Sequence, residues 1–173
     1  MLKKLRNDEF DQVYRIMEAS FPVDERRPFD EQRALLEDPA YQIFVCKTPG
    51  SEDIAAFVAV WEFESVAFLE HFAVAPQCRN GGLGAKVLKE LVEQAGKTVC
   101  LEAELPETEI AARRIAFYER NGFFLNPYPY LQPPISEGCN AVPLQIMTSG
   151  RPVSEEEFQH IKALLYRRVY RQS

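Results

Sequence analysis

The sequence predicts a mixed α/β fold in which a central sheet carries helices on both faces. Apolar, strand-like segments gather between residues 41 and 74. A strand–helix–strand–helix–strand order follows between residues 66 and 125. The chain has 173 residues, of which 46% are hydrophobic and 27% charged. These values suit a single domain over 1–173 with one proper core.

Periodicity predicts the N-terminal elements. Residues 1–6 can start a strand, and apolar side chains at helical spacing predict a helix over 8–20, capped by Asn7 or Asp8. Residues 30–38 predict a second, shorter helix. Three apolar strands separated by short turns come next: 41–47, 54–63 and 66–74.

The C-terminal half alternates strands with helices. The helix over 107–120 stops at Asn121-Gly122, a pair typical of helix C-termini. The strands of this half are predicted at 98–103, from 123 to 125 onward, and at 142–148. Since strands and helices alternate here, the helices are expected to cover the sheet.

A basic, glycine-rich turn lies between the strand over 66–74 and the helix that Leu83, Val87 and Leu88 begin. The turn reads Arg79, Asn80, Gly81, Gly82, Leu83, Gly84 and Ala85. Glycines let a backbone approach a bulky ligand, and the free N–H groups at a helix N-terminus favour anions. The turn is therefore predicted to hold a phosphate or pyrophosphate, with the Arg79 guanidinium as an added donor.

Two other phosphate motifs do not fit this turn. A P-loop needs Gly-Lys-Ser/Thr, but Gly84 is followed by Ala85 and Lys86. A dinucleotide fingerprint needs a small residue where Val87 stands. The remaining pattern, Arg79-x-x-Gly82-x-Gly84, resembles the pyrophosphate-binding motif of the GCN5-related N-acetyltransferases. The alternative is a helix N-terminus that happens to be rich in glycine.

A second motif resembles the same family. Residues 117–123 read Phe-Tyr-Glu-Arg-Asn-Gly-Phe, similar to the family signature Phe-Tyr-x-x-x-Gly-Phe. The resemblance implies that Tyr118 lies near the cofactor sulfur and acts as general acid. The alternative is a buried helix aromatic. The chain departs from the family pattern at Ala111 and Arg114, where the family prefers asparagine and alanine.

The resemblance implies a mixed, mostly antiparallel central sheet with helices on both faces, the acyl-CoA N-acyltransferase fold. It also implies direct acetyl transfer from acetyl-CoA, through a ternary complex, to a primary amine of a small molecule or peptide. The backbone of Phe72, Ala73 and Val74 would pair with the pantetheine arm, and an N–H near Val74 would stabilise the oxyanion. The amides of Arg79–Ala85 would hold the pyrophosphate.

The reaction needs a base for a protonated amine, and Glu70 is the first candidate. Strict alternation along 66–74 would place Glu70 with Phe68 and Phe72, and His71 on the opposite face. A lone carboxylate among aromatic rings is expected to have a raised pKa. Related acetyltransferases often carry a glutamate on this strand. The alternative is a structural charge paired with an arginine or lysine. His71 is the runner-up base, and four carboxylates remain open: Glu62, Glu64, Glu102 and Glu104.

Two segments are candidates for the amine pocket. The family implies that residues 21–33 and 126–142 shape it. Tyr128 and Tyr130 lie among prolines and offer an aromatic surface that suits a cation. A long ordered connection without a ligand role is the alternative. Polyamine, amino acid, aminoglycoside and peptide N-terminus all remain open as acceptors.

The segment 150–173 predicts a C-terminal helix. Ser154 and Glu157 form a capping-box pattern, and Phe158, Ile161 and Leu165 begin an apolar stripe. This helix is expected to pack on its own domain, and a homodimer contact is the alternative.

Composition bounds the function. The net charge of −6 disfavours nucleic acid and mildly favours a cationic substrate. Four isolated cysteines and two histidines indicate neither zinc nor any other metal. Neither a membrane-spanning run nor a signal peptide is recognisable, so a cytoplasmic location is expected. An acyl-CoA-binding sensor with little catalysis remains an alternative to the enzyme.

Overall fold

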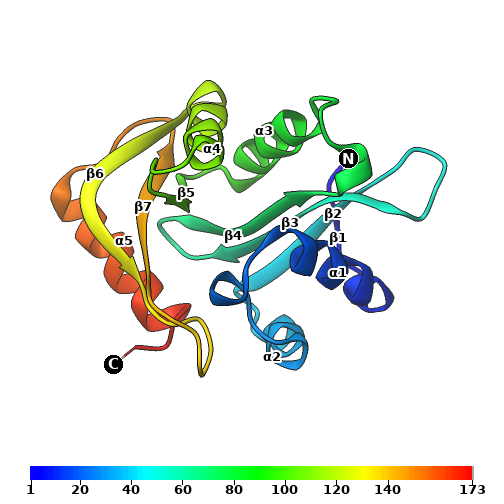
Figure 1. Cartoon of the computed structure of the whole chain (residues 1–173), viewed down its shortest axis with the longest axis horizontal. Coiled ribbons are helices and arrows are strands. Elements are labelled where there is room, and N and C mark those ends of the chain that lie inside the picture. Colours follow the sequence, from blue (N-terminus) through cyan, green and yellow to red (C-terminus); the bar gives the residue numbers. More distant parts are fainter. Residues whose placement is uncertain (173) are drawn as a thin grey trace.

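The computed structural model describes residues 1–172, which form a seven-stranded sheet of order β1-β2-β3-β4-β5-β7-β6 (Figure 1). The strands are β1 Lys3–Lys4, β2 Tyr41–Lys47, β3 Ile54–Glu62, β4 Ala67–Val74, β5 Val99–Glu104, β6 Phe123–Gln132 and β7 Val142–Ser149. The helices are α1 Phe10–Ser20, α2 Phe29–Ala34, α3 Leu83–Ala95, α4 Glu109–Arg120 and α5 Glu155–Arg168. Neighbouring strands are antiparallel except β4 and β5. The predicted mixed, mostly antiparallel sheet is confirmed.

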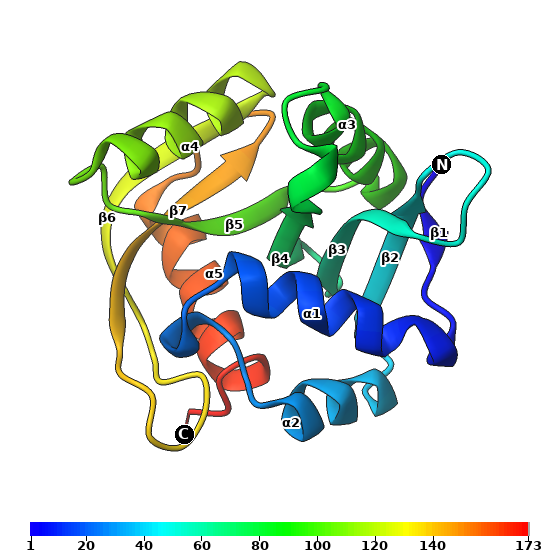
Figure 2. The ribbon, with the colours of Figure 1, turned by 45° about the vertical axis from the view of Figure 1, so that its right-hand side comes forward.

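Helices cover both faces of the sheet, as predicted (Figure 2). Strand β3 shows why: its side chains are buried on both sides, with Phe57 and Trp61 in one apolar layer and Val58 and Val60 in the other. The layer that holds Trp61 also receives side chains of α1 and α5. The layer that holds Val58 receives those of α3 and α4.

The two central strands separate partway along their length. β4 and β5 pair in parallel over Ala67–Leu69 and Val99–Leu101. β4 then continues to Val74 and β5 to Glu104 beyond this paired segment. A gap therefore opens in the middle of the sheet, and backbone groups of both strands face it.

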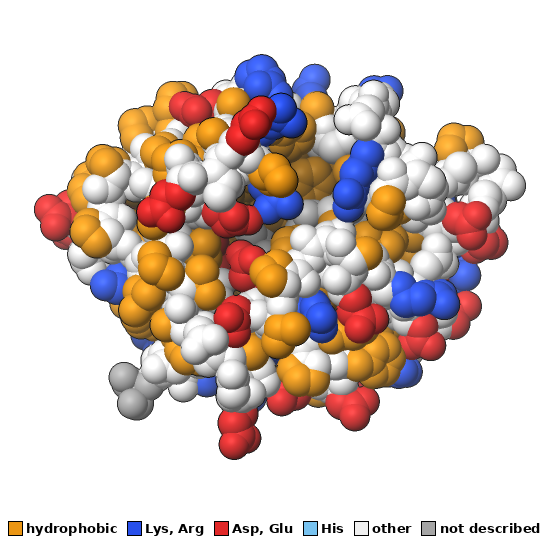
Figure 3. Space-filling view, in the orientation of Figure 1, with side chains coloured by type: hydrophobic (Ala, Val, Ile, Leu, Met, Phe, Trp, Pro, Cys, Tyr) orange, Lys and Arg blue, Asp and Glu red, His pale blue; other side chains and the backbone are white. Residues whose placement is uncertain are grey.

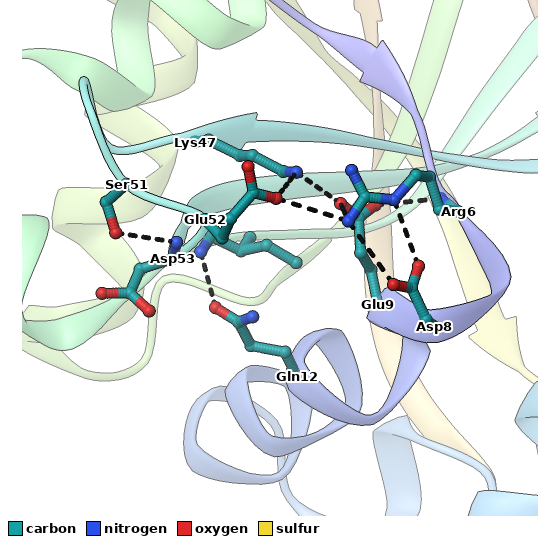
Figure 4. A network of polar contacts seen from close by, with 9 residues as sticks. Arg6, Asp8, Glu9, Gln12, Lys47, Ser51, Glu52 and Asp53 are labelled. Carbon is teal, nitrogen blue, oxygen red and sulfur yellow. Dashed lines mark hydrogen bonds and ion pairs between the residues drawn. The ribbon is translucent and has the colours of Figure 1, made fainter.

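The start of α1 differs from the prediction. Neither Asn7 nor Asp8 caps the helix, because a 3₁₀ turn over Asn7–Glu9 precedes it. The Glu9 carboxylate instead accepts a hydrogen bond from the Arg6 backbone N–H at 2.9 Å. It also lies 2.6 Å from the Lys47 ammonium, which ties this turn to the end of β2 (Figure 4).

Replacing Glu9 with glutamine is expected to lower the free energy of unfolding by about 1–2 kcal/mol at neutral pH. Burial alone would raise the pKa of Glu9, but the hydrogen bonds from Lys47 and Arg6 outweigh it and leave that pKa below its usual value. The contribution of Glu9 is therefore present above about pH 4.3 and disappears as the pH falls through the lowered pKa. Urea unfolding at two pH values measures it, with the exposed Asp8→Asn as control. A difference between wild type and Glu9→Gln that persists at low pH would contradict this account.

The expected long connection over 126–142 is wrong in its first part, because strand β6 occupies it. The strand runs to Gln132, and its register shifts between Asn126 and Tyr130, where Pro127 and Pro129 stand. β6 is at the edge of the sheet, so residues that lack an N–H donor are tolerated there. The prolines therefore mark a bulge in a strand rather than a loop.

Helix α5 starts with the predicted capping box of Ser154 and Glu157, which is confirmed. Phe158 and Leu165 are fully buried against the sheet. The Tyr128 ring packs on Phe158 with 5.1 Å between the ring centroids. Across residues 1–172, every helix is too short or too polar to cross a membrane.

Candidate active site

A cleft of about 420 Å³ lies where β4 and β5 separate. Its wall combines the end of α1 and the loop after it with β4, β5 and α4. The lining residues are Ala19–Pro22, Glu25, Phe72, Ala73, Arg79, Glu102–Glu104, Arg114 and Tyr118. In Figure 3 this face is hollowed near its centre, and charged side chains of both signs surround the hollow.

The glycine-rich turn begins at the mouth of this cleft. Arg79 Nε donates to the Val74 carbonyl at 3.0 Å, and Arg79 Nη2 donates to Ser20 Oγ at 3.3 Å. Gly82 precedes α3 with a φ of 79°, a conformation that favours glycine. Because Gly82 has no side chain to cap the helix, the first N–H groups of α3 stay available to an anion. Of the remaining predicted contacts, Asn80–Gly82 lie in this turn and Leu83–Ala85 in the first turn of α3.

Strand β4 contains a bulge that sequence alternation did not reveal. Ala59 pairs with His71 and Val60 with Leu69, so Glu70 is an extra residue in β4. The prediction that Glu70 and Phe72 share a face, opposite to His71, is therefore wrong. Phe72 packs in the layer of α3 and α4. His71 lies on the other side, where its ring contacts the Phe21 ring at a centroid distance of 4.8 Å.

Glu70 lies inside a buried ion pair. Its side chain is 2% exposed, and its carboxylate is 2.9 Å from Arg27 Nη1. It also accepts a hydrogen bond from Trp61 Nε1 at 2.8 Å. Burial alone would raise the pKa of Glu70, but the Arg27 charge outweighs it and the pKa lies below the usual range. The predicted raised pKa is wrong, and with it the catalytic role of Glu70 loses its physical basis.

Tyr118 lies on α4 and lines the cleft. Its ring packs edge-on against Phe117 and Phe123, with centroid distances of 5.5 and 5.8 Å. Burial raises the pKa of the Tyr118 hydroxyl to about 12, although the nearby Arg114 charge opposes the shift. The hydroxyl therefore keeps its proton at neutral pH and can donate it.

Of the four carboxylates that the sequence left open, Glu102 and Glu104 line the cleft, and Glu102 has the more buried environment. It accepts hydrogen bonds from the hydroxyl groups of Tyr170, at 2.6 Å, and Tyr130. Burial raises the pKa of Glu102 to about 7, and the two tyrosine hydrogen bonds moderate that rise. A carboxylate with such a pKa can accept a proton near neutral pH. Tyr130 is thus a partner of Glu102 rather than an exposed surface for a cation.

Residues 10–123 match the sequence model of the acetyltransferase (GNAT) family, and the chain belongs to this family.

Among particular proteins, the chain is 29% identical over 112 residues to YjbC of Bacillus subtilis, which is assigned as an acetyltransferase. The match covers 64% of this chain and 55% of YjbC, so the chain spans about half of that relative. A structure from Bacteroides thetaiotaomicron, assigned to the GNAT family, has a TM-score of 0.89 at 29% identity and covers 100% of this chain and 99% of its own. The Escherichia coli ribosomal-protein-S18-alanine N-acetyltransferase shares the fold, with a TM-score of 0.67 at 22% identity over 90% of this chain and 96% of its own.

Proposed function

We propose that the chain transfers an acetyl group from acetyl-CoA to a primary amine, directly and through a ternary complex. The observation that carries this proposal is that Tyr118 and Glu102 line one cleft, at the point where β4 and β5 separate. A proton donor and a proton acceptor thereby face the same space. The GNAT family uses acetyl-CoA, and the residues around the cleft fit that co-substrate.

The fit rests on two backbone features. Phe72–Val74 belong to the part of β4 that extends beyond its pairing with β5, so their amide groups can pair with the pantetheine arm. An N–H near Val74 would stabilise the oxyanion. The turn from Arg79 to Ala85 would hold the pyrophosphate at the open N-terminus of α3.

The chemistry then assigns one proton to each side chain. The amine nitrogen must lose a proton before it attacks the thioester carbonyl carbon, and the Glu102 carboxylate accepts that proton. As the carbon–nitrogen bond forms and the carbon–sulfur bond breaks, Tyr118 donates its phenolic proton to the departing sulfur. The nitrogen then gives its second proton to the Tyr118 phenolate, and Glu102 releases its proton to water. The products are an amide and a free thiol, so atoms and charges balance.

Calorimetric titration with acetyl-CoA, followed by a panel of amines and a free-thiol readout, tests this function. Binding together with thiol release is the expected result. Binding without release from any amine would favour the alternative of an acyl-CoA sensor. Failure to bind acetyl-CoA would overturn the assignment of Arg79–Ala85.

Replacing Tyr118 with phenylalanine is expected to lower kcat by about 10²-fold, with little change in acetyl-CoA affinity. This loss of rate is at the low end of the usual effect of a general acid. The reason is that a thiol, with a pKa of about 8.5, is already a fair leaving group. The phenyl ring keeps its packing on Phe123. Steady-state kinetics and calorimetry on one preparation measure both quantities. Tyr128→Phe is the matched control, since that hydroxyl donates to the Val153 carbonyl away from the cleft. Unchanged kcat in Tyr118→Phe would remove the acid role.

A further inference from the structure

The cleft holds more acidic than basic side chains on the side away from Arg79. Glu25, Glu102 and Glu104 line it together with Arg114. Arg114 Nη1 is 2.6 Å from a Glu104 oxygen, so these two charges offset one another. Glu102 is hydrogen-bonded to its tyrosines. Within residues 1–172, the structure gives the Glu25 carboxylate neither a hydrogen bond nor an ion pair.

The surroundings of Glu25 disfavour the charged form of its carboxylate. Burial, and next the Glu104 charge, raise the pKa of Glu25 above its usual value. A half-buried carboxylate near other carboxylates is stabilised by a cation that enters the cleft.

The loop that carries Glu25 is held in place from two sides. The Glu25 carbonyl is 2.7 Å from His71 Nε2 on β4. The neighbouring Asp24 carboxylate accepts hydrogen bonds from Asn140 N at 2.9 Å and Asn140 Nδ2 at 3.2 Å. In addition, Gln132 Nε2 donates to the Asp24 carbonyl at 3.2 Å. Glu25 is therefore presented to the cleft by an ordered segment, which reduces the entropy cost of binding a cation.

We propose that Glu25 determines specificity: the acceptor is a small amine with a second cationic group, which Glu25 binds while the reacting nitrogen lies between Glu102 and Tyr118. This inference rests on the proposed acetyl transfer and names its substrate class. The cleft volume of about 420 Å³ suits a small molecule. An amine that carries a carboxylate in place of the second cation is repelled by the same side chain.

Three acceptors with the same reacting end test the proposal: butylamine, 1,4-diaminobutane and 4-aminobutyrate. We expect kcat/KM for the diamine to exceed that for butylamine by about tenfold, after correction for its two equivalent amino groups. The value for 4-aminobutyrate is expected to be at least about tenfold below that for butylamine. Glu25→Gln should reduce the diamine preference to within about twofold. Glu18→Gln, which removes an exposed carboxylate of α1 outside the cleft, should keep it.

The outcomes distinguish a failure of the inference about Glu25 from a failure of the proposed acetyl transfer. Equal rates for the diamine and butylamine, or a preference that survives Glu25→Gln, would overturn the role of Glu25 and leave acetyl transfer standing. Thiol release with uncharged or anionic amines in preference to the diamine would do the same. If none of the amines gives thiol release, the transferase function and the inference are both overturned.

Discussion

Replacing Arg27 with methionine is expected to lower the free energy of unfolding by about 3–5 kcal/mol at neutral pH. The Arg27 and Glu70 side chains are 6% and 2% exposed, and 2.9 Å separates their charged atoms. Methionine fills a similar volume, but it leaves the Glu70 carboxylate buried without its counter-charge. Urea unfolding measures the loss. Arg33→Met, which removes an exposed arginine from the nearby helix α2, should stay within about 0.5 kcal/mol of wild type.

The pH dependence identifies the unpaired charge as the cause. In wild type the pKa of Glu70 is lowered, so the stability that this group contributes is present above about pH 4.3 and lost as the pH falls through that lowered pKa. In Arg27→Met the main opposing charge is gone, and burial outweighs the remaining Trp61 hydrogen bond, so the pKa of Glu70 rises above its value in the unfolded chain. Protonation then favours the folded variant, so the difference between wild type and Arg27→Met should shrink on acidification.

A double variant separates charge from packing. Arg27→Met combined with Glu70→Gln removes both charges and keeps an acceptor for the Trp61 N–H. It should recover most of the lost stability, because a neutral pair has a much smaller desolvation cost. A double variant that stays as unstable as Arg27→Met would show that packing of the Arg27 side chain, not its charge, dominates.

Local patterns were sufficient to predict most of the fold. The apolar segment 41–47 coincides with β2, and the glycine-rich turn leads directly into α3. Such features are encoded in consecutive residues. The bulge at Glu70 was missed because it depends on the register between β3 and β4, which periodicity within one strand cannot specify. The continuation of β6 through Pro127 and Pro129 likewise depends on its position at the sheet edge.

Sequence motifs single out two of the residues that line the cleft. Tyr118 and Arg79 both line the cleft, and their roles as acid and as phosphate donor stay predictions. The sequence did not single out Glu102, the base that we propose, because its environment comes from distant residues. Tyr170 is 68 positions away from Glu102, and Arg27 is 43 positions before Glu70 (70 − 27). Only the folded chain reveals which glutamate has a tyrosine neighbour and which has an arginine.

These two glutamates show how environment divides their roles. Both are buried, and burial alone would raise the pKa of each. Arg27 reverses the shift for Glu70, whereas Glu102 has only neutral hydroxyl partners and keeps a pKa of about 7. Opposite shifts of neighbouring carboxylates separate a structural charge from a group suited to proton transfer.

Replacing Glu102 with glutamine is expected to lower kcat/KM for an amine acceptor by about 10³-fold at neutral pH. An alkylamine with a pKa of about 10.4 is almost fully protonated there, so the base supplies most of the reactive nitrogen. Because the base must be ionised, the wild-type kcat/KM should rise with pH through about 7, the pKa of Glu102. In Glu102→Gln that limb should be absent. Its kcat/KM should rise only as the pH approaches the pKa of the amine. The kcat/KM values of wild type and Glu102→Gln should therefore converge at alkaline pH.

Tyr170→Phe provides the matched variant, because it alters the environment of the base and keeps the base itself. Loss of the 2.6 Å hydrogen bond from the Tyr170 hydroxyl removes a group that stabilises the Glu102 carboxylate. The pKa of Glu102 should therefore rise, and the pH limb near 7 should move upward with modest loss of rate at its plateau. A structural role for Glu102 would lower activity equally at all pH values and leave the limb in place. If kcat/KM of Glu102→Gln still rises with pH through about 7, the base is another group.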